Sequence, residues 1–286
     1  MKSFDEQLAH LVQEALREDV GDGDHSTLSS IPAGKKGKAV LKIKQAGILA
    51  GVAVAEKIFR MADPTVIFHA WKQDGEAMEP GQQAFEVEAS VHAILTCERL
   101  VLNCMQRMSG IATLTHTYAE KLKGYHTRLL DTRKTTPNFR LLEKEAVRIG
   151  GGVNHRFGLY DMIMLKDNHI DYCGGLEKAI DAAFNYSQKM NHPLQIEVET
   201  RSLDDVRKVC SVGKGKVFRI LLDNFTPAQI AEALQVINKA FETEASGGIN
   251  LDTIQAYAAT GVDYVSVGGL IHQAQSLDLS LKAVLL

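Results

Sequence analysis

Basic side chains directly follow two short β-rich segments of this sequence. Arg133 and Lys134 come after Leu129-Leu-Asp131, and Lys166 comes after Met162-Ile-Met-Leu165. Cations at the ends of buried strands gather at the open end of a sheet, where they repel one another unless an anion lies between them. Guanidinium groups bind carboxylates through paired hydrogen bonds. The pattern therefore predicts a site for a ligand with several negative charges, with Arg156 and Arg99 as further candidates.

A simpler explanation exists for many basic residues, because Lys and Arg near helix ends often only face solvent or the helix dipole. We accept it for Lys144 and Arg148, which lie beside glutamates in a helical pattern. This explanation does not suit Lys166, because its side chain would extend from the end of a buried strand. Lys166 therefore stays a candidate for the anion site.

Pairs of glycines follow the last two β-rich segments. Ser246-Gly247-Gly248 precedes an expected helix start at Ile249-Asn-Leu-Asp252, and Val267-Gly268-Gly269 precedes Leu270-Ile271. Glycines let backbone N–H groups approach a phosphate, and a helix N-terminus adds a favourable dipole. A glycine pair can also simply make a tight turn. Two pairs on consecutive final strands favour a phosphate site, which β/α barrels often place after their last two strands.

Between the basic residues and the glycine pairs, the expected strands end in acidic side chains. Glu199 and Asp223 close apolar runs, and Glu197 lies two residues before Glu199 on the same face. Carboxylates near a phosphate site can bind ribose hydroxyls or hold Mg²⁺. For Glu197, an internal ion pair with Lys166 or Arg156 explains the residue equally well.

His155 adjoins Arg156 in a glycine-rich segment, and it is either a ligand of the anion or a packing residue. The sequence has no histidine pair of the zinc-hydrolase type, no Walker loop and no GxSxG motif. Zinc hydrolysis, nucleotide hydrolysis and serine acyl transfer therefore lack support.

The order of the segments indicates two parts. Residues 4–17 and 53–61 have helical spacing, β-rich segments with interspersed glycines fill much of 35–95, and a long helical pattern covers 96–123. This first part is typical of a small α+β domain.

After Lys123-Gly124, β-rich and helical segments alternate at intervals of about 20–35 residues, as in parallel βαβ units. The expected strands are 127–132, 161–166, 195–199, 218–223, 242–245 and 263–267, and the expected helices are 139–149, 175–190, 202–211, 227–238 and 250–260. A doubly wound sheet gathers its functional groups at one switch point, whereas a β/α barrel carries them at the ends of several strands. Because nearly every expected strand ends in a polar group or a glycine pair, we predict a barrel.

Composition limits the possible partners. The 286 residues carry a net charge of −3, which argues against a nucleic-acid binder with its strongly basic face. The acidic, amphipathic N-terminus does not have the pattern of a signal peptide, and no apolar run has the length of a membrane span. The four cysteines form no CxxC pair, which favours buried, reduced thiols. We expect a cytoplasmic protein without nucleic-acid or membrane partners.

Several segments, taken in order, resemble the quinolinate phosphoribosyltransferase family. They are Glu98-Arg-Leu-Val-Leu-Asn103, Ser109-Gly-Ile-Ala-Thr113, Asp131-Thr-Arg-Lys-Thr-Thr-Pro137, Gly151-Gly-Val-Asn-His-Arg156, Lys166-Asp-Asn-His169, Leu221-Leu-Asp-Asn-Phe225 and Glu244-Ala-Ser-Gly-Gly248. The loop Glu18–Asp24 also fits, and no position of these motifs departs from the expected residue type.

The resemblance implies a reaction and an architecture. The reaction joins quinolinate to phosphoribosyl pyrophosphate with Mg²⁺, giving nicotinate mononucleotide, CO₂ and pyrophosphate for de novo NAD synthesis. The fold is an α/β protein with an incomplete, TIM-like β/α barrel preceded by a small α+β domain. The expected parts are an N-terminal domain with a connecting helix at 1–123, the barrel at 124–270, and a C-terminal segment at 271–286 that packs back on the N-terminal domain. The family is a homodimer in which Arg99 would act in trans, and higher oligomers remain open.

The resemblance also implies roles for residues. Lys134, Lys166, Glu199 and Asp223 would be catalytic, with Glu199 and Asp223 holding Mg²⁺ directly, through water or through substrate. The substrates would be bound by Arg99, Thr132, Arg133, Lys134, His155, Arg156, Lys166, Glu197, Glu199 and Asp223. The 5′-phosphate would lie on Ser246, Gly247, Gly248, Val267, Gly268 and Gly269.

Two other functions remain open. A paralogue on the same scaffold would act on another acid, such as nicotinate, or serve in molybdenum transport. A non-catalytic anion-binding scaffold would bind the ligand without turnover, and the intact set of Lys166, Glu199 and Asp223 argues against it.

Overall fold

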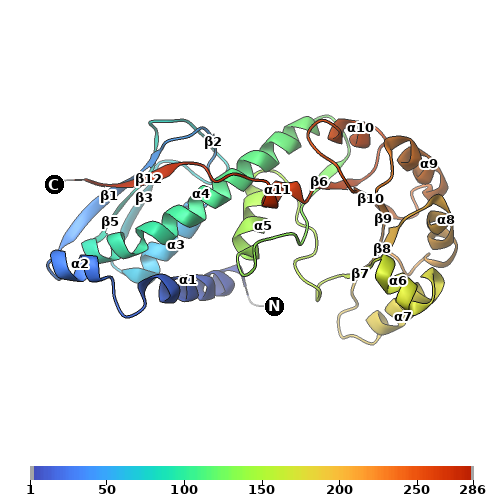
Figure 1. Ribbon diagram of the computed structural model, residues 1–286, viewed down its shortest axis with the longest axis horizontal. Helices are drawn as coiled ribbons and strands as arrows, with labels where there is room; N and C mark the ends of the chain where they lie inside the picture. Colours follow the sequence, from blue (N-terminus) through green and yellow to red (C-terminus); the bar gives the residue numbers. More distant parts are fainter. Residues whose placement is uncertain (1–2, 285–286) are drawn as a thin grey trace. The chain divides into compact units, whose positions relative to one another are not determined.

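The computed structural model describes residues 3–284, and the chain divides into two compact units (Figure 1). The first unit comprises Met1–His116, Thr135–Gly151 and Leu270–Leu286, and the second comprises Thr117–Lys134 and Gly152–Gly269. Thr135–Gly151, which lies inside the barrel range expected from the sequence, is therefore grouped with the N-terminal residues. No helix among residues 3–284 combines the length and apolar character needed to span a bilayer.

The first unit is built on an antiparallel sheet. Its strands are β1 (Lys36–Ile43), β3 (Ile67–Ala70), β5 (Gln83–Ser90) and β12 (Leu279–Val284), in the order β12-β1-β5-β3, beside a small pair of β2 (Gly47–Ile48) and β4 (Ala77–Met78). The helices are α1 (Phe4–Val20), α2 (His25–Ser30), α3 (Val52–Ala62), α4 (Val91–Lys121), α5 (Arg140–Ile149) and α11 (Gly269–His272). Phe59, Phe68 and Phe85 stack in the core between sheet and helix. The α+β class expected for this part is confirmed.

Several local expectations for this unit need correction. The helix expected at 96–123 begins earlier, at Val91, because the Ser90 hydroxyl accepts the Ala93 N–H at its start. The loop expected at 18–27 is largely helical, since α1 continues to Val20 and Asp24 caps α2 through the Thr27 N–H. Strand β12, which we did not expect, pairs antiparallel with β1 along its length (Figure 1).

Two side chains are buried differently from the expectation. Lys144 was assigned to the solvent, but it is only 2% exposed in α5, whereas Arg148 is exposed and pairs with Glu145 as expected. Cys173 was counted among buried thiols and is exposed, while Cys97 and Cys104 are buried.

The motif Ser109–Thr113 holds the first unit together. Ser109 Oγ accepts the Ala50 N–H at 3.0 Å, and Thr113 Oγ1 accepts the Ile48 N–H at 2.8 Å. A Cβ on Gly110 would come within 2.0 Å of the Gln275 carbonyl oxygen. The motif therefore joins α4 to two neighbouring backbone segments.

The second unit is a parallel sheet with helices on its outer side. Its strands are β6 (Arg128–Leu130), β7 (Ile163–Leu165), β8 (Ile196–Thr200), β9 (Arg219–Asp223), β10 (Glu242–Ser246) and β11 (Tyr264–Ser266), in the order β6-β11-β10-β9-β8-β7. The helices are α6 (Asp167–Cys173), α7 (Leu176–Gln188), α8 (Leu203–Val212), α9 (Pro227–Ile237) and α10 (Ile254–Ala258). Each expected strand and helix of this part is present, most with shorter bounds.

The sheet forms an incomplete β/α barrel, as expected. Adjacent strands are parallel throughout, and β6 and β7 are the two edges of the described sheet. A single bridge from Leu130 to Val153 lies beyond β6. Because all strands run the same way, their carboxyl ends lie at one end of the barrel.

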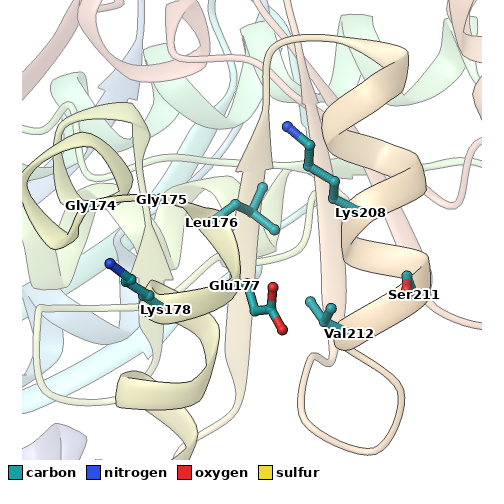
Figure 2. A pocket seen from close by; sticks show the side chains of 8 residues that line it. All are labelled: Gly174, Gly175, Leu176, Glu177, Lys178, Lys208, Ser211 and Val212. Carbon is teal, nitrogen blue, oxygen red and sulfur yellow. The ribbon is translucent and has the colours of Figure 1, made fainter.

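A pocket of about 420 Å³ opens between α7 and α8 on the helical layer (Figure 2). Its lining is Gly174, Gly175, Leu176, Glu177, Lys178, Lys208, Ser211 and Val212. Both lysines are exposed, and none of these residues ends a barrel strand. The pocket is therefore a surface groove separate from the strand-end residues.

Candidate active site

The second unit brings together fifteen of the sixteen residues selected from the sequence. They are Thr132, Arg133, Lys134, His155, Arg156, Lys166, Glu197, Glu199, Asp223, Ser246, Gly247, Gly248, Val267, Gly268 and Gly269. The strand register aligns Ser246 with Asp223, so these two strand ends are neighbours. Arg99 is exposed on α4 in the first unit and is the one residue outside this set.

Arg133 and Arg156 lie close enough to each other for their charges to interact. Burial lowers the pKa of Arg156 below the usual arginine range, and the charge of Arg133 lowers it further. The buried Arg133 Nε has no hydrogen-bond partner among residues 3–284. A buried guanidinium N–H without a partner is costly. The pair therefore fits an anionic ligand that would accept these donors.

The acids at the ends of β8 and β9 lie near Lys166. Its Nζ is 3.7 Å from Glu199 Oε2, and its side chain remains 49% exposed. Burial raises the pKa values of Glu199 and Asp223, Lys166 lowers both, and the charge of Asp223 raises that of Glu199. Two partly buried carboxylates that repel each other are a donor set that a divalent cation would stabilise.

The glycine loop after β10 is tightly built. Gly247 has a φ of 102°, and a Cβ there would lie 2.2 Å from Asn224 Oδ1. The Asn224 N–H donates to the Ser246 carbonyl at 2.8 Å, which ties this loop to the end of β9. A side chain at this position would collide with Asn224, so only glycine suits Gly247.

The start expected for the helix after this loop is wrong. Helix α10 begins at Ile254, because Asn250 Oδ1 accepts the Asp252 and Thr253 N–H groups and makes a turn first. After β11, the short helix α11 starts at Gly269 itself. A phosphate at the first loop would therefore meet backbone N–H groups without a helix dipole behind them.

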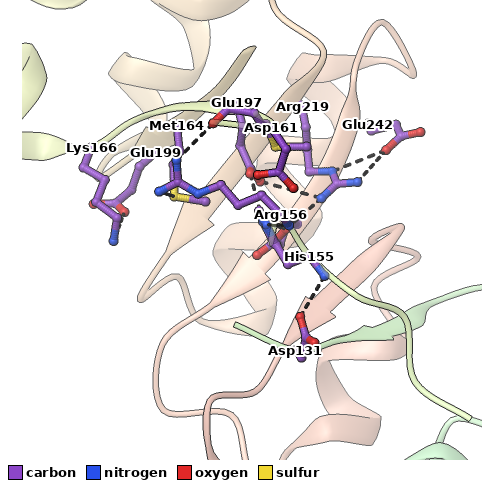
Figure 3. A network of polar contacts seen from close by, with 12 residues as sticks. Asp131, His155, Arg156, Asp161, Met164, Lys166, Glu197, Glu199, Arg219 and Glu242 are labelled. Carbon is purple, nitrogen blue, oxygen red and sulfur yellow. Dashed lines mark hydrogen bonds and ion pairs between the residues drawn. The ribbon is translucent and has the colours of Figure 1, made fainter. Parts of the chain in front are cut away.

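A charged cluster fills the barrel interior below the strand ends (Figure 3). His155 Nε2 lies 2.9 Å from Glu197 Oε2 and 3.2 Å from Glu244 Oε2. Arg219 Nη1 lies 3.1 Å from Glu244 and 3.9 Å from Glu197. Neither Lys166 nor Arg156, the expected partners of Glu197, makes this ion pair. Glu197 is completely buried and pairs instead with His155 and Arg219.

His155, Glu197 and Glu244 lie close enough together to bind a metal ion. Burial lowers the His155 pKa, but the bonds and charges of Glu197 and Glu244 together raise it to about 9. A protonated imidazole cannot bind a metal, and Arg219 already neutralises the carboxylates. His155 and Arg219 each lie within ion-pair distance of both carboxylates, so the cluster fits a closed ionic network and not a cation site.

The segment after Val153 is held by Asp131 as well. The completely buried Asp131 accepts the His155 N–H at 2.8 Å and the Asn154 Nδ2–H at 2.7 Å. Arg156 donates to the Met162 carbonyl at 3.1 Å, and the Phe157 N–H donates to Asp161 at 2.6 Å. The backbone around Arg156 is therefore fixed on both sides.

Asp131, Arg219 and Glu244 are residues that the sequence analysis missed as part of this arrangement. A signal was present in their spacing. Arg219 precedes Asp223 by four residues, and Glu244 precedes Ser246 by two, so each shares a strand face with a site residue. Charged residues on the inner face of a barrel strand are candidates for the same site.

Charge on His155 makes stability depend on pH. Its folded-state pKa of about 9 lies above the ordinary 6.5, so its stabilising contribution is complete below pH 6.5 and is lost as the pH rises through 9. We expect the urea unfolding midpoint to fall between pH 6.5 and pH 9.5, and to fall less in His155→Asn. Equal decreases in both proteins would contradict the assignment.

Fold and site define a β/α-barrel protein with basic and acidic side chains at the ends of its strands, and comparison with known proteins gives the family. Residues 24–109 match the quinolinate phosphoribosyl transferase N-terminal domain, and residues 111–282 match its C-terminal domain. The chain belongs to the quinolinate phosphoribosyl transferase family, which confirms the resemblance in the sequence.

The sequence aligns with those of named relatives over nearly its whole length. Quinolinate phosphoribosyltransferase (decarboxylating) 1b of Nicotiana tabacum is 42% identical, over 96% of this chain and 82% of its own. The probable nicotinate-nucleotide pyrophosphorylase (carboxylating) of Bacillus subtilis (strain 168) is 40% identical, over 98% and 94%. The crystal structure of NadC from Streptococcus pyogenes superimposes with a TM-score of 0.91 at 41% identity, over 100% and 99%.

Proposed function

We propose that this protein transfers the phosphoribosyl group of phosphoribosyl pyrophosphate to quinolinate and releases CO₂, giving nicotinate mononucleotide and pyrophosphate in de novo NAD synthesis. The observation that carries the proposal is the division of charge in one barrel. Arg133, whose buried Nε has no hydrogen-bond partner among residues 3–284, and the neighbouring Arg156 suit the two carboxylates of quinolinate. The acids and the Gly247 loop on the later strands suit a sugar phosphate.

The geometry supports a mechanism based on placement and charge. The arginines would hold the pyridine ring so that its nitrogen faces the ribose C1, to which it bonds as pyrophosphate leaves. Positive charge develops on the ribose in this step, and the carboxylates of Glu199 and Asp223 would stabilise it. Lys134 and Lys166 would neutralise the departing pyrophosphate. The ribosylated ring is cationic, so it accepts the electron pair left when CO₂ departs, and the ring carbon then takes a proton.

Glu199 and Asp223 would hold Mg²⁺, either directly or through water or substrate. Their mutual repulsion and partial burial support this assignment. Bound there, the ion would supply charge neutralisation for pyrophosphate. We expect chelation with EDTA to abolish turnover and added Mg²⁺ to restore it, measured as pyrophosphate release. Full turnover after exhaustive chelation would contradict a metal requirement.

Arg99 would complete the site from the other subunit of a homodimer. Its exposure and its place in the first unit are compatible with a contact to another chain. Mixing Arg99→Ala and Lys166→Ala chains, each inactive alone, should restore about one quarter of wild-type activity to the mixture. About half of the reassorted dimers are hybrids, and each hybrid contains one intact site of two, as expected for closed twofold symmetry. Absence of recovery after proven subunit exchange would refute the trans arrangement. We also propose a cytoplasmic location.

The substrate is tested by measuring ¹⁴CO₂ from carboxyl-labelled quinolinate with and without phosphoribosyl pyrophosphate. Release that needs both compounds, with equal formation of nicotinate mononucleotide, supports the proposal. Turnover of nicotinate but not quinolinate would identify a paralogue with another acid substrate. Binding of quinolinate without any turnover would identify a scaffold.

A further inference from the structure

The chain turns sharply at the end of β9, directly after Asp223. Asn224 has a φ of 59°, in the left-handed region that few residues other than glycine adopt. Its N–H donates to the Ser246 carbonyl at 2.8 Å, and the next residue, Phe225, is buried. The backbone of Asn224 is therefore held at the carboxyl end of the sheet, beside an acid of the site and the glycine loop after β10.

The Asn224 side chain contacts both of these groups. Its Nδ2–H donates to Asp223 Oδ2 at 2.7 Å. The same amide lies where a side chain of residue 247 would be, because a Cβ on Gly247 would come within 2.2 Å of Asn224 Oδ1 and 2.7 Å of its Cγ. The glycine at position 247 thus leaves room for the amide, and the amide in turn binds the Asp223 carboxylate.

A left-handed turn alone does not require this side chain, since glycine adopts a positive φ more easily than asparagine. Asn238 shows the simpler case. It ends α9 with a φ of 46°, it is exposed, and its side chain makes no hydrogen bond to any of residues 3–284. Asn224 has a similar backbone conformation, but its amide also binds a carboxylate of the site. The turn does not account for that contact.

The bond limits how the Asp223 carboxylate can rotate. A carboxylate accepts hydrogen bonds at two oxygens, so Oδ1 can bind a ribose hydroxyl or Mg²⁺ while Asn224 holds Oδ2. A side chain that is already oriented loses less conformational freedom when its ligand binds. The bond should therefore strengthen binding of whatever Asp223 binds.

We propose that Asn224 is a positioning residue for the phosphoribosyl donor: its amide, seated against Gly247, orients the Asp223 carboxylate toward the ribose and its metal ion. The inference rests on the proposed function, which assigns the ribose and Mg²⁺ to Asp223. Asn224 acts through Asp223, and the arginines hold quinolinate. Loss of the amide should therefore weaken binding of the phosphoribosyl donor and leave binding of quinolinate unchanged.

The test compares two substitutions of asparagine by glycine. Asn224→Gly removes the amide and keeps a backbone conformation that glycine adopts readily. Asn238→Gly makes the same change at the opposite end of α9 from Asp223, with the same gain in flexibility of the unfolded chain. We expect Asn224→Gly to raise the KM for phosphoribosyl pyrophosphate about tenfold, the effect of losing one hydrogen bond to a charged group. The KM for quinolinate should change less than twofold, and Asn238→Gly should leave both values unchanged.

A double-mutant cycle tests whether Asn224 acts through Asp223. The readout is the Kd for phosphoribosyl pyrophosphate with Mg²⁺, measured by calorimetry, which needs no turnover. Asn224→Gly should weaken binding about tenfold in the otherwise native chain, and less than twofold in an Asp223→Ala background. Equal weakening in both backgrounds, or a matching rise of both KM values, would overturn the proposal.

Failure of this inference is distinguishable from failure of the proposed function. A wild-type protein that forms no nicotinate mononucleotide from quinolinate would refute the proposed function. An active wild type together with an unaffected Asn224→Gly refutes only the role of Asn224. Equal thermal unfolding midpoints of Asn224→Gly and Asn238→Gly would show that the change in KM does not come from loss of stability.

Discussion

Replacing Lys166 by Ala is expected to lower kcat by roughly 10²–10³-fold while the thermal unfolding midpoint stays the same. Removing one donor that stabilises developing charge typically costs this much. The ammonium is half-exposed and lies 3.7 Å from Glu199 Oε2. An exposed pair of this kind contributes little to stability. The loss should therefore appear in turnover, measured by steady-state kinetics with both substrates saturating.

Controls for this prediction come from within the same unit. Lys208→Ala removes an exposed lysine from the groove between α7 and α8 and should leave kcat unchanged.

Arg133→Ala should also abolish most turnover, because it removes a buried donor of the anion site. Near-normal rates in Lys166→Ala or Arg133→Ala, in folded protein, would exclude that residue from the site.

Replacing Glu143 by Gln is expected to lower the free energy of unfolding by about 3 kcal/mol, because it leaves the partly buried Arg107 guanidinium without its counter-charge. Glu143 is completely buried in α5. It accepts Arg107 Nε at 3.0 Å and Nη2 at 2.8 Å, and the Thr136 N–H at 2.7 Å. Arg107 also donates to the Ile271 and Ala274 carbonyls, so the pair joins α4, α5 and the C-terminal segment.

The matched control is Glu145→Gln on the same helix. Glu145 pairs with the exposed Arg148, and loss of such a surface pair costs roughly 0–1 kcal/mol. Thermal unfolding should separate the variants, with Glu143→Gln lower by about 10 °C and Glu145→Gln close to wild type. If the two variants unfold at the same temperature, the Arg107–Glu143 pair does not stabilise the first unit.

Strand-end residues were the part of the site most accessible to sequence reasoning. Arg133, Lys166 and Asp223 stand directly after apolar runs, and a parallel sheet places such positions at one end. The expectation that Glu197 pairs with Lys166 or Arg156 failed because the side chain points into the barrel interior, where His155 reaches it. That contact joins residues 42 positions apart and leaves no local pattern.

By itself, the sequence determined the parallel barrel, the small α+β part and the family, because hydrophobic periodicity and strand-end motifs are local properties of the chain. Only the tertiary structure decided that residues 135–151 join the first unit, and that Asp131, Arg219 and Glu244 lie around the His155–Arg156 segment. These contacts depend on how distant strands align across the barrel. Burial makes each such charge expensive to leave unpaired, so the folded barrel determines each partner.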